Sequence, residues 1–457
     1  MATRRQKPSL GMILGVASLA ALMSGGVAWG EDTQASLSEH AARVLKGETA
    51  SAAGSSPRQQ ADNTSGAVTN ALSNLTIHGY LQQAYATADF ASGGLVVPSA
   101  DEVALGIPED GTFSYRNVAL QFRYDITPRD VMVVQLSNRA LGESPVEDIE
   151  DEVELDWAFY ERKLADYTSV KVGRVQIPLG IYNEVRDVGV ILPQFRPAFT
   201  FYREGTFTNE TVDGILLQHT FAPLSDWSLE ASAYFGDWEL LELDPFTAGG
   251  QFVVAKAKDS YGAQLWLNSP WGVRFGLGGQ VRELSGGLEG LVRPVDGTTE
   301  FDDIYASIDA PIGNRFVVRA EWRLSDAPPD DAFFGGEFET YYIQLGINLT
   351  SKLRLFLQTE YQEARQDRTD FIRPLGLPAT EDTEAVLREE YSVALNYTIA
   401  PHLVLKLEHH FDIRNEDLTF VPVFDPSLGP APPVALQPQY FENDDGEYTI
   451  LSIATAF

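Results

Sequence analysis

The sequence contains no cysteine, so no disulfide can stabilise its fold. This absence is compatible with an exported chain that does not depend on disulfides. Beyond residue 30 there is also no apolar run long enough to cross a bilayer as a helix, so any membrane residence must come from strands. Basic residues are few: 33 Lys and Arg against 65 Asp and Glu give a net charge of −32, which argues against nucleic acid as a partner.

Motifs of known catalytic chemistry are missing as well. There is no nucleophile elbow, phosphate-binding glycine loop or zinc motif. Of the six histidines, only His409 and His410 are clustered, in Glu408-His409-His410, and strand alternation would place these two imidazoles on opposite faces. We therefore predict no enzyme, cofactor or metal site. Two alternatives remain open: an outer-membrane barrel enzyme of the hydrolase type, and a structural or adhesive barrel whose loops bind a partner.

The N-terminus has the pattern of a secretory signal peptide. Arg4 and Arg5 precede the apolar run Leu10–Met23, and Ala28-Trp29-Gly30 has the small residues that a signal peptidase reads. A permanent anchor helix is the alternative, but the run is short for a membrane span. We predict a signal peptide over residues 1–30, with cleavage before Glu31.

The next segment, residues 31–74, differs from the rest of the chain. It is rich in Ala, Ser, Gln and Asn, and only Ala35–Lys46 could form an amphipathic helix. Such a composition favours a mostly disordered extension, which would lie in the periplasm. From residue 75 to residue 457 we find one repeating organisation with no internal linker.

Short turns and long polar loops alternate along this region, a rhythm expected of a transmembrane barrel. The predicted turns are Asp125–Asp130, Leu164–Thr168, Ala222–Trp227, Asn268–Gly272, Ala310–Arg315, Leu349–Lys352 and Ile399–His402. Strands read outward from them number about 16, and the long loops Asp237–Lys258 and Asp412–Gly446 leave room for 18. We predict an all-β fold, a transmembrane antiparallel β-barrel over residues 75–457 with short periplasmic turns and long extracellular loops.

Alternation within the strands supports this fold. Val118, Leu120 and Phe122 share one face of a strand while Ala119 and Gln121 share the other. In a barrel in lipid the apolar side chains point outward and the polar side chains point inward, whereas a soluble sandwich turns its apolar face inward. Both folds show the same alternation, so periodicity alone cannot distinguish them. The number of strands and the export signal favour the barrel.

The last strand carries a further signal. Leu451, Ile453 and Phe457 fall on one face, and the chain ends on that aromatic residue. This pattern resembles the terminal strand by which barrel proteins reach the bacterial outer membrane. It implies a Gram-negative outer-membrane location and recognition by the barrel-assembly machinery. The alternative is a soluble protein that happens to end on a strand.

The third long loop, Gln176–Asn209, is the candidate constriction of the pore. We assign five of its charged residues to that constriction: Arg186, Arg196, Arg203, Glu184 and Asp187. Three prolines stiffen the loop, as a segment folded into a pore would require. An ordinary surface loop is an equally weighted alternative at this stage.

A family resemblance is carried by the run Val172–Val188 (VGRVQIPLGIYNEVRDV), by Leu192-Pro193-Gln194 behind it and by Val212-Asp213-Gly214 in the next strand. His78-Gly79-Tyr80 near the start is similar too. These motifs resemble a proteobacterial porin-like outer-membrane family, which implies a diffusion porin. The general trimeric and phosphate-selective porins, more loosely similar, imply a third loop that narrows the channel and assembly as a homotrimer.

The alternation of side chains along each strand predicts which cations point into the barrel. The inward set is Arg123, Arg139, Lys171, Arg274, Arg282, Arg319, Arg323, Arg354 and Lys406. Such a set favours anions electrostatically, although pairing with acids on neighbouring strands is the alternative. We predict a porin for passive diffusion of small hydrophilic solutes, with a slight preference for anions.

Its predicted partners are outer-membrane lipid, lipopolysaccharide and the diffusing solutes. An acidic run around Glu147–Asp156 offers carboxylates that could share divalent cations with lipopolysaccharide phosphates, although a solvated loop is the commoner meaning of such a run.

Overall fold

The structure is a computed structural model that describes residues 73–89, 105–142, 144, 153–202, 210–221, 226–244, 251–287, 298–327, 336–366, 383–424 and 434–457. The predicted signal peptide at residues 1–30 lies outside these described residues, as does the extension apart from its last two positions.

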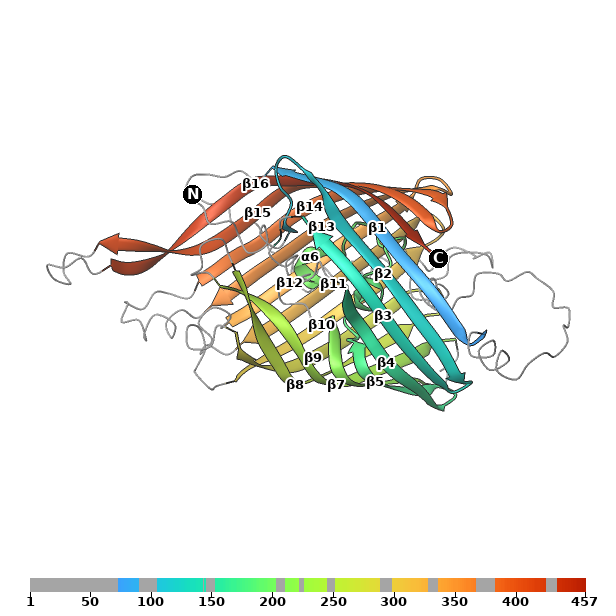
Figure 1. Cartoon of the computed structure of the whole chain (residues 1–457). Helices are drawn as coiled ribbons and strands as arrows, with labels where there is room; N and C mark the ends of the chain where they lie inside the picture. Colours follow the sequence, from blue (N-terminus) through green and yellow to red (C-terminus); the bar gives the residue numbers. More distant parts are fainter. Residues whose placement is uncertain are drawn as a thin grey trace, which may run out of the picture.

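Sixteen antiparallel strands close into one barrel, in which each strand pairs with its neighbours in the sequence and β1 pairs with β16 (Figure 1). The strands are β1 (Leu75–Asp89), β2 (Thr112–Thr127), β3 (Asp130–Leu141), β4 (Glu154–Ala165), β5 (Thr168–Gln176), β6 (Thr211–Thr220), β7 (Ser228–Asp244), β8 (Gln251–Asn268), β9 (Arg274–Gly286), β10 (Thr299–Ile312), β11 (Phe316–Ala327), β12 (Gly336–Asn348), β13 (Leu353–Gln366), β14 (Thr383–Ala400), β15 (Leu403–Phe424) and β16 (Val434–Ala456). The predicted strand number and topology are confirmed.

The alternation has the sense expected in lipid. On β2, Leu120 is 41% exposed on the outer face while the neighbouring Gln121 is 5% exposed on the inner face. On β16, Leu451 and Ile453 are exposed and Ser452 between them is buried. Apolar side chains therefore point out and polar side chains point in, which is the reverse of a soluble sandwich.

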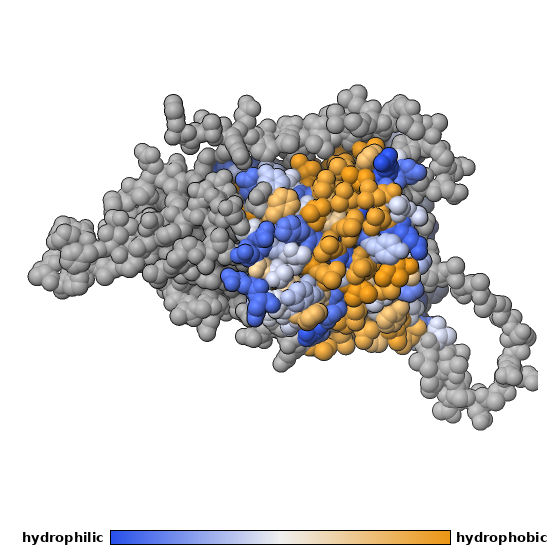
Figure 2. All heavy atoms as spheres, turned by 90° about the horizontal axis from the view of Figure 1, so that it is seen from above, coloured by the Kyte–Doolittle hydropathy of each residue, from blue (hydrophilic) through white to orange (hydrophobic). Residues whose placement is uncertain are grey.

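The outer apolar side chains form a band around the barrel. Figure 2 shows this band on one face, with hydrophilic residues beside it. It includes Leu81 of β1, Leu407 of β15 and Leu395 of β14, each more than a third exposed. A closed sheet pairs every backbone group of its strands internally, so the band can contact hydrocarbon without unpaired edges.

Closure of the barrel depends on a glycine and the terminal aromatic residue. Gly79 of β1 and Phe457 exchange two backbone hydrogen bonds, each 3.0 Å long. A Cβ at position 79 would overlap the Phe457 ring, so the absence of a side chain there makes space for it. The register also places the start of β1, the end of β16 and the short turns together, and we call this the periplasmic end.

Two hairpins are longer than the sequence predicts. The segments Asp237–Lys258 and Asp412–Gly446 were predicted as long loops, but the β7–β8 hairpin runs on to Asp244 and Gln251 and the β15–β16 hairpin to Phe424 and Val434. Antiparallel hydrogen bonding continues for as long as both strands remain paired, and composition does not show where it stops.

Helix is scarce. The described residues contain the 3-10 turn η1 (Asn183–Val185) and the short helix α6 (Phe199–Tyr202), and Figure 1 shows α6 within the barrel. No helix among the described residues is long and apolar enough to cross a membrane.

Candidate functional site

The chain between β5 and β6 folds into the barrel. We call residues 177–202 the inner loop. All of its residues are buried except five: Gly180, Ile181, Glu184, Val190 and Ile191. Helix α6, at the end of this loop, contacts β11, β12 and β13. The inner loop is therefore packed against the inner wall rather than lying on the outer surface.

Asp187 attaches the inner loop to the barrel wall at β2 and β3. Its carboxylate accepts hydrogen bonds from Arg139 of β3 at 3.1 Å, from Asn117 of β2 at 3.2 Å and from Gln135 of β3 at 3.0 Å. Burial alone would raise the pKa of Asp187, but the charge of Arg139 and the Asn117 hydrogen bond outweigh burial and lower that pKa below its ordinary value. The carboxylate is thus charged near neutral pH.

Around this attachment lies a set of carboxylates. Asp156, Asp187 and Glu210 each have an oxygen within 4.8 Å of the others, and among the described residues they are the group that could hold a metal ion. Arg139 is 3.0 Å from Glu210, and Arg186 is 3.7 Å from it. These two guanidinium groups already provide positive charge where a cation would sit.

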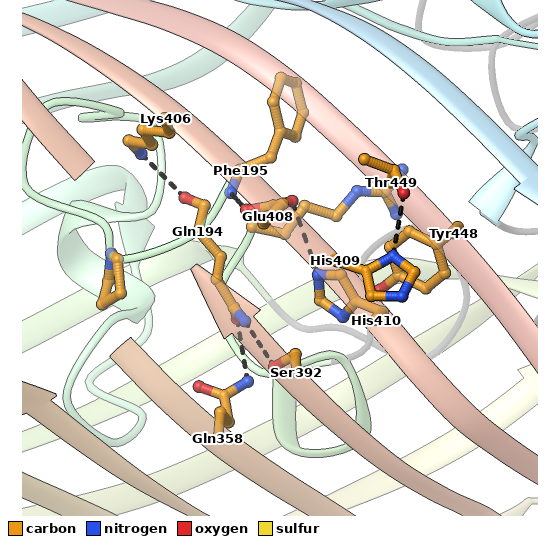
Figure 3. Close-up of polar contacts among 12 residues, drawn as sticks. Gln194, Phe195, Gln358, Ser392, Lys406, Glu408, His409, His410, Tyr448 and Thr449 are labelled. Atoms are coloured by element: carbon orange, nitrogen blue, oxygen red, sulfur yellow. Dashed lines mark hydrogen bonds and ion pairs between the residues drawn. The ribbon is translucent and has the colours of Figure 1, made fainter. Parts of the chain in front are cut away.

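Strands β14 and β15 hold the part of the inner loop around Gln194 through the polar groups drawn in Figure 3. Gln194 donates to Ser392 of β14 at 2.6 Å, and its backbone oxygen accepts a hydrogen bond from Lys406 of β15 at 2.9 Å. The backbone N–H of Phe195 donates to Glu408 at 2.7 Å. Residues far apart in the sequence thus satisfy the loop's buried polar groups, as burial requires.

Two buried tyrosines, one near each end of the inner loop, fix the loop to β11. The backbone N–H of Tyr182 donates to the Tyr202 hydroxyl at 2.8 Å, and that hydroxyl donates to Glu321. Glu321 also accepts from the Ile181 N–H at 2.9 Å. Thr200 binds Glu360 of β13 through both its N–H and its hydroxyl. Burial raises the pKa of both tyrosines, so they act as neutral hydrogen-bonding groups.

The predicted constriction residues do not gather at one place. Arg186 and Asp187 lie together beside Arg139 of β3 and Glu210. Arg196 lies elsewhere, with its guanidinium 5.1 Å from the Tyr115 ring and hydrogen-bonded to that hydroxyl. Glu184 is the exposed charge of the inner loop, and Arg203 lies outside the described residues. Their role in a constriction remains a prediction.

The predicted wall cations lie on the inner face, and most are engaged. Asp303 of β10 pairs with Arg282 at 2.5 Å and Arg323 at 2.8 Å. Arg319 pairs with Asp309 at 3.1 Å. Arg123 pairs with Asp125, and Arg139 with the inner loop. Lys171, Arg274, Arg354 and Lys406 have no ion-pair partner among the described residues.

Sequence reasoning missed one buried charged cluster. Arg388 and Glu390 of β14 form an ion pair of 2.5 Å, and Glu390 also pairs with His410 of β15. The Tyr448 ring stacks on His410 with centroids 4.0 Å apart. The alternation could have indicated the inward direction of Arg388, but the sequence predicts a strand over Glu389–Thr398, and Arg388 lies one residue outside it. His409, in contrast, bonds Thr449, so the two imidazoles lie on opposite faces as alternation predicts.

Comparison with known proteins gives structural likeness but no sequence family. No family model matches the chain, and no curated protein sequence matches it. The solved structure of OmpF from Salmonella typhi in complex with daunomycin has a TM-score of 0.50 at 12% identity and covers 84% of this chain and 97% of that chain.

Two other similar structures are an outer-membrane channel, DcaP of Acinetobacter baumannii, and an anion-selective porin from Comamonas acidovorans. The first has a TM-score of 0.48 at 11% identity and covers 84% of this chain and 97% of that chain. The second has a TM-score of 0.48 at 12% identity and covers 84% and 99%.

The closed sixteen-stranded antiparallel barrel with an apolar outer band is the fold of the outer-membrane porins. A barrel of this kind resides in the bacterial outer membrane.

Proposed function

We propose that this barrel is a porin through which small hydrophilic solutes diffuse passively across the outer membrane, with loop 176–209 as its constriction. The observation that carries the proposal is the inner loop itself, buried within a closed barrel and held by polar side chains of β2, β3 and β11–β15. A barrel of sixteen strands is too wide to fill with its own side chains, and an inward loop narrows it.

The cations of the inner wall that have no ion-pair partner in the described ranges support a slight preference for anions. Buried pairs such as Arg319 with Asp309 have little net charge to offer a solute. Lys171 and Arg354 add positive charge at positions of the inner wall that are not buried, and neither has an ion-pair partner among the described residues. Arg274 and Lys406 also lack an ion-pair partner there, but both are buried. Confined charges of one sign favour counter-ions in a channel. Glu184 of the inner loop partly opposes them.

The partners we propose follow from separate surfaces. The outer apolar band would contact membrane lipid, and the acidic run near Glu147 would meet lipopolysaccharide through shared divalent cations. The terminal strand would be read by the barrel-assembly machinery after the signal peptide at residues 1–30 is removed, leaving residues 31–74 in the periplasm. Assembly as a homotrimer rests on the family resemblance alone, and crosslinking of the purified protein would test it.

Single-channel recording in a planar bilayer tests the function. A porin gives stepwise, long-lived conductance, and a zero-current potential in a KCl gradient reports ion preference. A protein that inserts as a folded barrel but gives no conductance would contradict the proposal and favour a hydrolase or an adhesive barrel.

A further inference from the structure

The exposed part of the inner loop is mostly aliphatic. Of its five residues that are not buried, Ile181, Val190 and Ile191 are apolar, and Glu184 is the one charge. Val190 and Ile191 pack against Tyr80 and its neighbours, which belong to the periplasmic half of the wall. Solvent inside the barrel therefore meets Glu184 and these partly exposed aliphatic side chains of the inner loop, whereas Arg186 and Arg196 are buried.

Partly exposed aromatic rings also lie on the inner wall. Phe159 of β4 packs against the same cluster as Ile181 and Ile191. Trp266 of β8 has the inward parity of Gln264, whose side chain hydrogen-bonds the inner loop. A Cβ at Gly276 would lie 2.9 Å from the Trp266 ring, so this glycine leaves room for the indole against the wall.

A cation lies on each of these two rings. The ammonium group of Lys171 is 5.0 Å from the centre of the Phe159 ring, and the guanidinium group of Arg274 is 4.3 Å from the Trp266 ring. Arg354 of β13, exposed on the inner face, adds a third positive charge towards the periplasmic end. None of these three cations has an ion-pair partner among the described residues.

In the ranges that the structure describes, the acidic side chains near Lys171 and Arg274 do not form ion pairs with these two cations. Glu161 is the register partner of Lys171, yet the two form no ion pair within the described part of the chain. Glu230 of β7 accepts a hydrogen bond from Asn268 at 2.8 Å, and Arg274 donates to that same amide at 3.0 Å. The acids therefore leave the two cation–aromatic pairs intact.

We propose that the periplasmic half of the inner wall, at Phe159, Lys171, Trp266 and Arg274, binds organic carboxylates with an apolar body, such as aromatic monocarboxylates. This proposal rests on the porin function proposed above and names its solute class. The carboxylate would meet Lys171 or Arg274, and the apolar body would meet the rings and the aliphatic loop surface. An inorganic anion could interact only with the positive charges, and an organic cation with an apolar body could interact only with the rings.

Benzoate is the probe, with acetate as the same charge without a ring and benzylammonium as a ring of opposite charge. Saturation-transfer NMR on the detergent-solubilised full-length protein would measure binding of all three. Single-channel recording would measure how long each interrupts the current. We expect benzoate to bind more tightly and to interrupt the current for longer than either comparison ion.

Matched variants locate the site. Phe159→Leu, Trp266→Leu and Lys171→Gln should each weaken benzoate binding roughly threefold to tenfold, the loss expected for a cation–aromatic or ring contact. Phe235→Leu on the lipid-facing side and Arg162→Gln on the outside of the barrel are the controls, and both should leave binding unchanged. Phe235 is 53% exposed and the Arg162 side chain 55% exposed.

The outcomes separate this inference from the porin function. Conductance with equal binding of benzoate and acetate, unaffected by the three inner-wall variants, would overturn the inference and leave the porin standing. Benzoate binding that depends on those variants in a barrel without conductance would overturn the porin and leave the site. Benzylammonium bound as tightly as benzoate would also overturn the inference, because the wall would then select rings without regard to charge.

Discussion

Single residues show how this barrel keeps charge in its interior. Buried ions are tolerated when they are paired and hydrogen-bonded, and removing one partner leaves the other buried without compensation. Asp303 with Arg282 and Arg323 is one such group on the wall. Asp187 with Arg139 is different, because it joins the wall to the inner loop and so links electrostatics to the position of that loop.

Asp187→Asn should therefore loosen the inner loop. The neutral amide cannot accept the hydrogen bonds from Arg139, Asn117 and Gln135 as the carboxylate does. Hydrogen bonds to charged groups contribute about 1.5–3 kcal/mol. We expect a lower unfolding temperature and noisier single-channel current. Asp213→Asn is the matched control, since Asp213 pairs with Arg174 in an exposed position and should contribute little. Equal effects of the two substitutions would contradict the role of Asp187.

The pH dependence of this attachment follows from the lowered pKa of Asp187. A depressed carboxyl pKa adds stability above the ordinary value of about 4, and that stability is lost as the pH falls through the lowered pKa. The difference in current noise between wild type and Asp187→Asn should thus be the same at pH 7 and pH 5. A difference that disappears already at pH 5 would show that Asp187 is protonated there.

At the scale of elements, the contact between β1 and the C-terminal residue gives a test of barrel closure. Gly79→Val should displace the Phe457 ring and lower the yield of folded barrel in the outer membrane, as should Phe457→Ala. Because both act on one contact, Gly79→Val should cost little more in the Phe457→Ala background. Ile77→Ala, a lipid-facing change on β1, is the control. Losses that simply add would mean that the two residues act separately.

The strands could be predicted from the sequence because alternation and short turns are local signals. Alternation along the strands is enough to predict that Arg319 and Lys406 lie on the inner face. The path of the inner loop could not be predicted in this way, since its partners are distant in sequence: Gln194 bonds Lys406, 212 positions away. Arg196 shows the limit most clearly, because its residue type suggested a constriction while packing set it against Tyr115.

We also expect the inner loop to limit the conductance of the channel. Replacing residues 183–192 with a short Gly-Ser linker removes buried mass from the lumen, so conductance should rise. An equal shortening of the connection between β13 and β14, at residues 367–382, is the control and should change it less. Unchanged conductance in the first variant would show that the loop does not limit ion flow.

At the scale of the whole molecule, an added charge should lower the unfolding free energy much more on the outer face of the wall than on the inner face. Leu407 is 47% exposed on the outer face, with Leu395 and Leu451 as its register partners. Leu407→Arg should cost about 2–4 kcal/mol if it lies near the bilayer midplane. Ser232→Arg, at a partly exposed inward position of β7, should cost much less. Comparing the unfolding free energies in lipid vesicles measures this difference, and equal costs would contradict the assigned faces.

The net charge of the whole chain, −32, is not the charge that a permeating ion meets. Screening limits exposed charges to about 8–10 Å at physiological ionic strength, so groups inside the barrel outweigh distant surface acids. Arg354→Glu should shift the zero-current potential in a KCl gradient towards cation preference, and Glu184→Lys should shift it towards anions, because each reverses an exposed charge on the inner side. Arg162→Glu makes the same change in charge on the outside and should shift the potential less. Selectivity that follows the total charge of the chain, with all three variants ranked by net charge alone, would contradict control by the inner wall.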